Sequence, residues 1–248
     1  MSERKSLSIG LCVITTGKYK QFFQQLLDGV NKYFLPTHKI NVFLFTDEYI
    51  GCESTDRVSV EQIFIPAYKF PFATLYRYKI FNEHRVHLRK ENYIFYTDCD
   101  MSFVNTVSDE ILGDGLTVVY HPGFYSQKNI VGHWGSNEVS EDSLAYVNPD
   151  KRIGYVAGGF NGATSFDFLK MSYILSKRID ADEALGVMAT YHDESHLNWY
   201  VKKFPERIKY LDPSYCLVEQ KHLREAWGIS HLPERIIALS KDHKSIRE

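Results

Sequence analysis

Apolar positions in the first part of the chain form continuous runs that alternate with a helical stripe. Residues 7–15 are an almost unbroken apolar run rich in β-branched side chains, which is typical of a strand covered on both faces. Between residues 20 and 34 the apolar side chains recur at intervals of three and four, which predicts a helix. Short buried strands are predicted next at 41–47 and 58–65. This order predicts an α/β fold with a mainly parallel sheet and helices on its faces.

The rest of the chain continues the pattern less regularly. It predicts a helix at 74–89, strands at 93–97 and 116–120, and further helices at 164–178 and 193–204. Residues 126–150 are polar and weakly periodic, which indicates a long loop of a kind that is often functional. The carboxyl-terminal stretch carries basic groups and few apolar anchors, which predicts a mobile tail. We find no repeat or linker and expect a single domain.

The charge balance excludes some classes of function. The 248 residues include 29 basic and 31 acidic side chains, for a formal net charge of −2. Without an excess of Lys and Arg, a general nucleic-acid-binding or polybasic-membrane role is disfavoured. No run approaches the roughly 20 apolar residues of a transmembrane helix, and the amino terminus lacks a secretory signal. We therefore expect a cytoplasmic protein without a transmembrane segment.

The four cysteines are too widely spaced to suggest a disulfide framework or a zinc knuckle. They are Cys12, Cys52, Cys99 and Cys216. We expect buried, reduced thiols that behave as small hydrophobic side chains.

Two aspartates, Asp98 and Asp100, come directly after the predicted strand at 93–97. Along an extended chain alternate side chains point the same way, so both carboxylates face one side at the end of the strand. In open α/β sheets ligands bind at the carboxyl ends of the strands. Two hard oxygen donors there suit Mn²⁺ or Mg²⁺ bridging to a diphosphate. The alternative is a plain acidic turn, because Asp favours chain reversals.

The stretch HDESH, at residues 192–196, opens a predicted helix. His192 and His196 have the spacing of a zinc pair, but an H-E-x-x-H protease needs Glu directly after the first His, where Asp193 stands. A metalloprotease is therefore disfavoured. Asp193 and Glu194 near a helix amino end are stabilised by the helix dipole, which is the structural explanation for them. A carboxylate in this setting is equally suited to act as a general base or nucleophile.

Residues 158–162 read Gly-Gly-Phe-Asn-Gly, and such glycines let a ligand or another backbone approach closely. The spacing is neither G-x-G-x-x-G after the first strand nor a P-loop, so a nicotinamide cofactor and ATP hydrolysis gain no support. A bulged turn explains the glycines equally well.

In order and spacing, these stretches resemble glycosyltransferase family 6, the retaining α1,3-galactosyl- and N-acetylgalactosaminyltransferases that include the blood-group A and B enzymes. The motifs are FTD (45–47), DCDMSF (98–103), HPGFY (121–125), AYV (145–147), YVAGGFNGAT (155–164), HDESHLNWY (192–200) and LDPSY (211–215). The resemblance covers nearly the whole chain from about Leu7. No stretch matches the membrane anchor and stem of the vertebrate members, so it suggests a bacterial or bacteriophage type.

The resemblance implies a GT-A fold, which is a Rossmann-like mixed, mainly parallel sheet with helices on both faces, in a single domain. Within residues 1–248 it implies a nucleotide-sugar-binding half at about 7–120 and an acceptor-binding and catalytic half at about 121–235. A mobile tail at about 236–248 would fold over the bound diphosphate.

The resemblance also implies roles for individual residues. Glu194 would be the catalytic carboxylate beneath the anomeric carbon, and Asp98 and Asp100 would hold Mn²⁺, with Mg²⁺ as a substitute. The implied donor-binding positions are Ile14, Thr15 and Tyr19 around uridine, Arg77 beside the acidic motif, Ala157, Gly158, Gly159 and Asp193 at the sugar, and Lys241 and Arg247 in the tail. The implied acceptor-binding positions are His121, Tyr191 and His192.

One segment departs from the family. Where the mammalian enzymes carry T-Y-E-R-R, this chain has SQKNIVGHWGSNEVSEDSL at residues 126–144, so the acceptor cannot be inferred from the resemblance. Small Gly159 leaves room for an acetamido group and favours UDP-GalNAc over UDP-Gal as the donor. The implied activity is Mn²⁺-dependent transfer from a UDP-sugar to a galactoside-type glycan in α1,3 linkage. A UDP-sugar hydrolase and a glycan-binding module are the alternatives.

Overall fold

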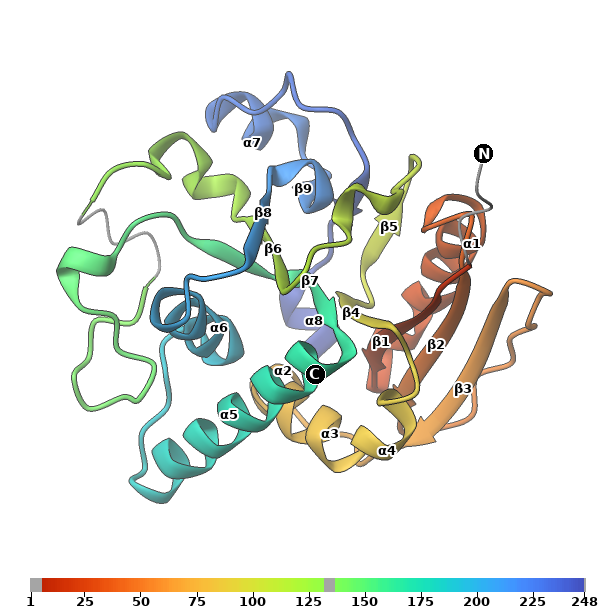
Figure 1. Ribbon diagram of the computed structural model, residues 1–248, viewed down its shortest axis with the longest axis horizontal. Helices are drawn as coiled ribbons and strands as arrows, with labels where there is room; N and C mark the ends of the chain where they lie inside the picture. The colour runs from red at the N-terminus through yellow and green to blue at the C-terminus, as the bar shows by residue number, and fades with distance from the viewer. Residues whose placement is uncertain (1–5, 132–136, 248) are drawn as a thin grey trace.

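The computed structural model of the protein describes residues 6–131 and 137–247 (Figure 1). Its strands are β1 Ser8–Thr15, β2 Lys39–Thr46, β3 Val58–Phe64, β4 Tyr93–Asp98, β5 Met101–Phe103, β6 Leu116–Tyr120, β7 Val156–Thr164, β8 Ile208–Leu211, β9 Leu217–Val218 and β10 Ile236–Ala238. Its α-helices are α1 Phe23–Tyr33, α2 Phe72–Leu75, α3 Arg77–Glu83, α4 Arg85–Leu88, α5 Ser165–Ala184, α6 His192–Lys203, α7 Lys221–Ala226 and α8 His243–Arg247. Short 3₁₀ helices are η1 Gly17–Phe22, η2 Asp109–Ile111, η3 Pro122–Gln127, η4 Pro149–Lys151 and η5 Pro213–Tyr215.

The centre of the fold is a seven-stranded sheet in the order β3-β2-β1-β4-β7-β6-β8. Strands β3, β2, β1 and β4 are parallel to one another, as are β6 and β8, whereas β7 runs antiparallel to both of its neighbours. The predicted mixed, mainly parallel sheet is confirmed. A second sheet, β5-β10-β9, was not predicted, because strands of two or three residues are too short to show a period.

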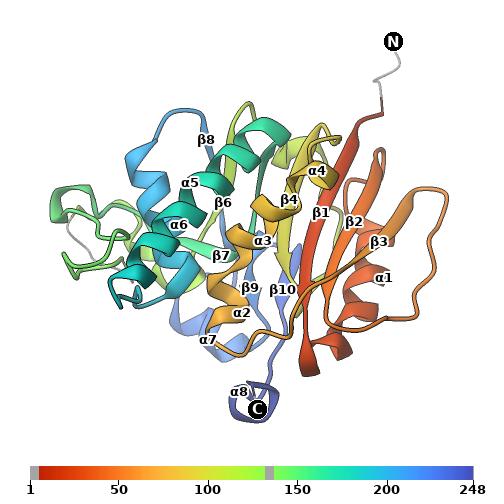
Figure 2. The same cartoon turned by 90° about the horizontal axis from the view of Figure 1, so that it is seen from below.

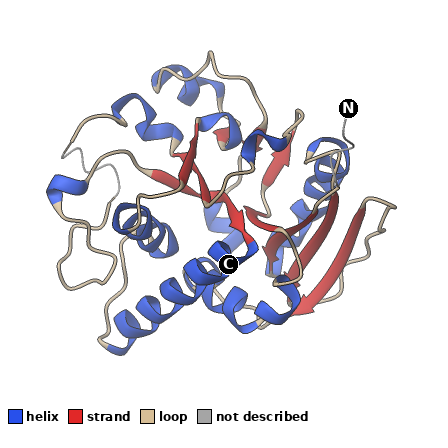
Figure 3. Cartoon of the chain, in the orientation of Figure 1, coloured by secondary structure: helices blue, strands red, loops and turns tan. Residues whose placement is uncertain are grey.

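Helices cover both faces of the large sheet, as Figures 2 and 3 show. On one face α1 and the small sheet enclose a core of aromatic rings, in which Phe95 stacks on Phe160 and meets Phe34 edge-on. On the other face α3, α5 and α6 pack over a second core that includes Phe81 and Phe168. Successive side chains of β4 alternate between the two cores, as expected for a central strand.

The predicted helices are present, but their bounds differ. The stripe at 20–34 begins as η1 and continues as α1, and the predicted helix at 74–89 is divided into α2, α3 and α4. The backbone leaves helical geometry at Tyr76 and His84, where ψ is 3° and 17°. An apolar stripe does not reveal such breaks, since the spacing of buried side chains continues across them. The first break makes Arg77 the first residue of α3.

Helix α5 extends beyond the predicted end at 178 because polar contacts hold its last turns. Lys79 in α3 pairs with Asp180 at 2.9 Å and with Glu183. Helix α6 lies within one residue of its prediction at each end.

The glycine-rich stretch lies in the central strand β7 and so is not a turn, but the predicted bulge is present. Val118 and Val119 of β6 pair with Asn161 and Ala157, so residues 158–160 of β7 bulge out of the pairing with β6. All four cysteines are free, as predicted, but Cys52 is only partly buried. Among the described residues, no helix combines the length and apolar character needed to cross a membrane.

Gly162 of β7 lies opposite Phe95 of β4, so close that an added Cβ would overlap the fully buried Phe95 ring. We expect Gly162→Ala to lower the free energy of unfolding by about 1–3 kcal/mol through overpacking of this core. Gly51→Ala is the matched control, because a Cβ at exposed Gly51 meets no atom within 4 Å. Equal urea midpoints for the two variants would contradict the close approach.

Candidate functional site

A cavity of about 400 Å³ opens at the carboxyl ends of β1 and β4. Its walls come from the β1–η1 connection, from residues 67–74 before and within α2, and from the end of β4. Lys241 and Ile246 of the carboxyl-terminal segment complete it. The cavity thus lies where parallel sheets usually bind ligands.

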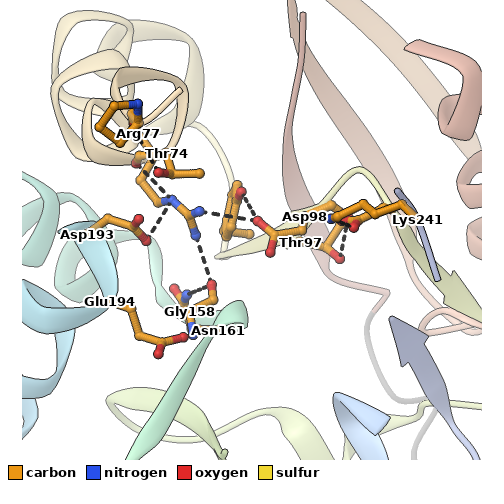
Figure 4. Close-up of polar contacts among 12 residues, drawn as sticks. Thr74, Arg77, Thr97, Asp98, Gly158, Asn161, Asp193, Glu194 and Lys241 are labelled. Carbon is orange, nitrogen blue, oxygen red and sulfur yellow. Dashed lines mark hydrogen bonds and ion pairs between the residues drawn. The ribbon is translucent and has the colours of Figure 1, made fainter. Parts of the chain in front are cut away.

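Arg77 is the centre of the polar network beside this cavity, as Figure 4 shows. Its guanidinium donates to Gly158 O at 2.9 Å and pairs with Asp98 Oδ1 at 3.2 Å and Asp193 Oδ2 at 3.1 Å. The Tyr96 ring lies 4.2 Å from Arg77 Cζ and covers one face of the cation. Arg77 is only 3% exposed, so this cation depends on its partners for compensation. One side chain therefore connects α3, β4, β7 and α6.

Asp193 is buried in the first turn of α6. Burial raises the pKa of Asp193 to about 7, and the nearby charges of Asp98 and Glu194 act in the same direction, while Arg77 opposes them. The site therefore changes its charge close to neutral pH.

Glu194 follows Asp193 and is held by two hydrogen bonds. Tyr155 Oη donates to Oε1 at 2.6 Å, and the backbone N–H of Gly158 donates to Oε2 at 2.7 Å. The carboxylates of Asp193 and Glu194 both lie next to Gly158. A Cβ built at Gly158 would lie 3.2 Å from Asp193 Oδ2 and 3.4 Å from Glu194 Oε2.

The start of α6 is fixed to β7 by Asn198. Its amide accepts from Val156 N at 2.9 Å and donates to Val156 O at 2.8 Å, and it also donates to Glu194 O at 2.9 Å. The side chain thus gives a residue of β7 the two hydrogen bonds that a neighbouring strand would supply. Asn198 lies four residues after Glu194 on the same face of α6.

Asp98 and Asp100 both line the cavity. Asp98 Oδ1 accepts from Tyr96 and Arg77, and Asp100 Oδ2 pairs with Lys241. No hydrogen bond is found in the described part of the chain for Asp98 Oδ2 or Asp100 Oδ1, so each carboxylate keeps an oxygen for a ligand. Within residues 6–131 and 137–247 there is no cluster of three or more metal-ligating side chains. The pair fits a divalent cation that takes its remaining ligands from a bound molecule and from water.

The structure brings most of the predicted donor residues together. Ile14, Tyr19, Asp98, Asp100 and Lys241 line the cavity, and Arg77, Gly158, Asp193 and Glu194 form the adjoining network. Gly159 joins the two groups, because a Cβ there would lie 3.1 Å from Asp98 Oδ2 and 3.6 Å from Cys216 Sγ.

Two predicted donor positions lie away from the cavity wall. Thr15 is fully buried, and its neighbour Thr16 lines the cavity instead. Ala157 of β7 points into the core that also contains Phe95 and Phe160. These placements follow from the alternation of side chains along a strand. The side chain of Arg247 lies outside the described part of the structure.

The predicted acceptor residues are not among the described residues that line the cavity. His121 contacts the rings of Phe124 and Tyr155, and burial lowers its pKa, so its Nδ1 accepts from Gly123 N. Tyr191 is 48% exposed at the start of α6. His192 contacts Phe70, whose own side chain lines the cavity.

Several polar residues of the site had no role in the sequence analysis. They are Tyr155 and Asn198, which lie inside quoted motifs, and Tyr96, Lys18 and Lys69. The spacing of Glu194 and Asn198 on one helix face was the available signal for Asn198. The partners of Tyr155 and Tyr96 depend on the tertiary fold.

Comparison with known proteins agrees with this arrangement. The family model described as "Glycosyltransferase family 6" matches residues 1–248. The chain is 28% identical over 250 residues to histo-blood group ABO system transferase 1 of Rattus norvegicus, which covers 98% of this chain and 69% of that protein. It is 28% identical over 224 residues to globoside alpha-1,3-N-acetylgalactosaminyltransferase 1 of Homo sapiens, which covers 87% of this chain and 62% of that protein. It is 27% identical over 199 residues to O-antigen biosynthesis glycosyltransferase WbnI of Escherichia coli, which covers 77% of this chain and 81% of that protein.

The raised pKa of Asp193 predicts how stability depends on pH. An aspartate in the unfolded chain titrates near pH ~3.9, whereas the folded value is about 7. Between these values the folded protein keeps a proton that the unfolded chain has released. The contribution of Asp193 to the stability of the folded protein is therefore fully present below about pH 4 and is lost as the pH rises to about 7.

An asparagine side chain does not titrate in this range. We therefore expect the free energy of unfolding of wild type to fall by roughly 1–3 kcal/mol relative to that of Asp193→Asn between pH 5 and 8. Urea unfolding of both proteins at the two pH values measures the difference. Exposed Asp150→Asn serves as the control and should follow wild type. Parallel pH dependences for wild type and Asp193→Asn would show that Asp193 does not titrate in this range.

Proposed function

Because the chain belongs to glycosyltransferase family 6 and is a hexosyltransferase, we propose that it transfers N-acetylgalactosamine or galactose from a UDP-sugar to a glycan. The new bond is an α1,3 linkage to a galactoside-type acceptor, formed with retention at the anomeric carbon. A divalent cation, Mn²⁺ or Mg²⁺, assists the reaction.

The observation that carries the proposal is the clamped carboxylate of Glu194 beside a cavity with an acidic pair at its wall. Glycosyl transfer breaks the bond between the anomeric carbon and the UDP oxygen, and the electron pair leaves with UDP. Positive charge then develops on the sugar and negative charge on the diphosphate. A site for this reaction needs fixed anionic groups near the sugar and cationic groups near the diphosphate.

The cationic groups stand at the nucleotide end. Lys18, Lys69 and Lys241 all line the cavity, and they can form charge-assisted hydrogen bonds with a diphosphate. The carboxyl-terminal segment also closes this end, because Ile246 is buried and Lys18 Nζ donates to Ser245 O at 2.6 Å. Closure excludes water, which a transferase needs in order to keep hydrolysis of the donor slow.

The acidic pair is suited to the cation. Asp98 and Asp100 would hold it through the oxygens that make no hydrogen bond in the described part of the chain. When bound, a divalent cation supplies positive charge that stabilises the departing diphosphate. Asp100 already holds the Lys241 ammonium, so the pair accepts positive charge in this conformation.

Glu194 acts at the sugar end. Its carboxylate stabilises the positive charge on the anomeric carbon, either through a covalent glycosyl intermediate or by supporting attack on the face that UDP leaves. Both routes give retention and require Glu194. Asp193, paired with Arg77, is placed to accept hydrogen bonds from hydroxyls of the donor sugar. A Cβ at Gly159 would lie 3.1 Å from Asp98 Oδ2, so a larger residue there would crowd the acidic motif, and the preference for a donor with a 2-acetamido group rests on the family resemblance.

A single assay tests the function. The protein is incubated with UDP-GalNAc or UDP-Gal, with Mn²⁺, and with or without fucosylated galactosides, and both UDP and product linkage are measured. UDP release stimulated by acceptor, with an α1,3-linked product, is the expected result. Release that no acceptor stimulates would indicate a UDP-sugar hydrolase, and no release would indicate a glycan-binding module.

We expect Glu194→Gln to lower turnover by at least about 10²-fold, because it removes the charge that stabilises the developing cation. UDP affinity should stay within about twofold of wild type, since Glu194 lies at the sugar end. Glu183→Gln is the matched control, because Glu183 also accepts from a tyrosine, Tyr76, but lies outside the cavity. Near-normal turnover of Glu194→Gln would remove Glu194 from its role.

We expect Asp100→Asn to lose stimulation by Mn²⁺, because the amide replaces a charged oxygen ligand. Binding of Mn²⁺ in the presence of UDP, followed by electron paramagnetic resonance, should weaken in parallel. Asp180→Asn removes a carboxylate that is likewise paired with a lysine, Lys79, and should behave as wild type. An unchanged metal response in Asp100→Asn would show that the acidic pair is only a turn.

A further inference from the structure

The two hydrogen bonds that hold Glu194 come from the same strand region. Gly158 lies in β7 and donates through its backbone, whereas Tyr155 lies just before β7 and donates through its hydroxyl. Every residue except proline keeps the backbone donor, whereas the hydroxyl depends on residue 155 being tyrosine. Its role in the reaction can therefore be tested.

Tyr155 is itself firmly fixed. The side chain is 2% exposed, and its ring meets His121 at 5.7 Å and Phe124 at 5.5 Å between centroids. Its carbonyl oxygen accepts from His121 N at 2.8 Å. A hydroxyl held on such a support orients the group that it binds at little cost in conformational entropy.

The hydroxyl also remains a donor. Burial raises the pKa of Tyr155 well above its usual value, and the charge of Glu194 adds to this effect. The phenol therefore keeps its proton over the pH range in which proteins are stable.

Glu194 needs such a donor because its charged neighbours are mostly acidic. Arg77 pairs with Asp98 and Asp193, and the hydrogen bonds to Glu194 in the described residues come from neutral groups. The titratable side chains that face Glu194 are Tyr78 of α3, His121 before η3, Asp193 of α6, Cys216 after η5, and Tyr155 itself. Burial keeps His121 neutral, so it supplies no positive charge here.

We infer that Tyr155 is a positioning residue for the transfer reaction: its hydroxyl holds Glu194 in the orientation that faces the anomeric carbon and supplies a hydrogen bond that the charged carboxylate needs. This inference rests on the proposed function. Tyr155 packs against His121, a predicted acceptor residue, and would thus set the orientation of the Glu194 carboxylate, which acts on the donor.

Tyr155→Phe tests the role of the hydroxyl, since it leaves the ring and its packing in place. Losing a hydrogen bond to a charged group should lower kcat by about 10- to 100-fold. The KM for the donor should stay within about twofold. Acceptor-dependent transfer and acceptor-independent release of UDP should fall by the same factor, because Glu194 acts on the donor in both. The acid limb of the kcat profile should move to higher pH, because the charged form of Glu194 loses a donor.

Tyr76→Phe is the matched control. It removes a tyrosine hydroxyl that likewise donates to a glutamate, Glu183, but neither residue lines the cavity, so kcat and its pH profile should stay as in wild type. A second variant carries 3,5-difluorotyrosine at position 155, which keeps the shape and the hydroxyl but makes it a stronger acid. Its acid limb should move in the direction opposite to that of Tyr155→Phe.

The outcomes separate the two levels of the proposal. If wild type releases no UDP from either donor, the proposed function fails, and the inference about Tyr155 fails with it. If wild type transfers sugar but Tyr155→Phe has normal kcat and pH profile, only the positioning role is overturned. If transfer falls while acceptor-independent release is normal, Tyr155 serves the acceptor pocket and the inference is also wrong. Should Tyr155→Phe unfold, the fluorinated variant decides alone, and an unshifted acid limb overturns the inference.

Discussion

The burial of one guanidinium, that of Arg77, connects the fold to the site. Its donors reach α2, β4, β7 and α6, through Thr74 O, Asp98, Gly158 O and Asp193. A buried cation and buried carboxylates are each costly alone and are tolerated only together. The end of β4 and the first turn of α6 are therefore held at a fixed distance, although nearly a hundred residues separate them along the chain. The acidic pair at the cavity and the acidic pair at the helix start become parts of one site.

The charges of the site are separated in space. Lysines line the cavity, where the proposed function puts the diphosphate, whereas Asp193 and Glu194 lie outside the cavity lining, with the Arg77 guanidinium between Asp98 and Asp193. A reaction that moves an electron pair from sugar to diphosphate develops charge in the same sense. Fixed groups that are already oriented need not reorganise during the reaction, which is the main way in which proteins stabilise such transition states. The purely structural alternatives, an acidic turn for Asp98 and Asp100 and a dipole-stabilised helix end for Asp193 and Glu194, do not explain why the two acidic motifs meet at one guanidinium.

The sequence predicts those parts of the molecule whose signals are local. Continuous apolar runs identify β1, β2 and β4, and the acidic motif at the end of β4 follows from the position of Asp98 after its strand. The small sheet and the breaks in the helix at 74–89 leave no periodic signal. Arg77 receives its role from resemblance to a family, because nothing in its immediate surroundings marks it. The local sequence marks Asp193 and Glu194 as candidate carboxylates, and only the resemblance selects Glu194 as the catalytic one. The partnership of Tyr155 with Glu194 depends on the packing of β7 against α6, which no spacing within either segment encodes.

The amide of Asn198 has one further consequence, which concerns the phase of α6. A helix packed on apolar contacts alone can slip along its neighbour, because such contacts are not directional. A slip of one residue would turn each side chain by about 100° around the axis and move it by about 1.5 Å. Glu194 would then leave the reach of both of its donors. The two directional hydrogen bonds between Asn198 and Val156 admit a single rotational setting of the helix. Asn198, one turn after Glu194, therefore fixes the direction in which the Glu194 carboxylate points.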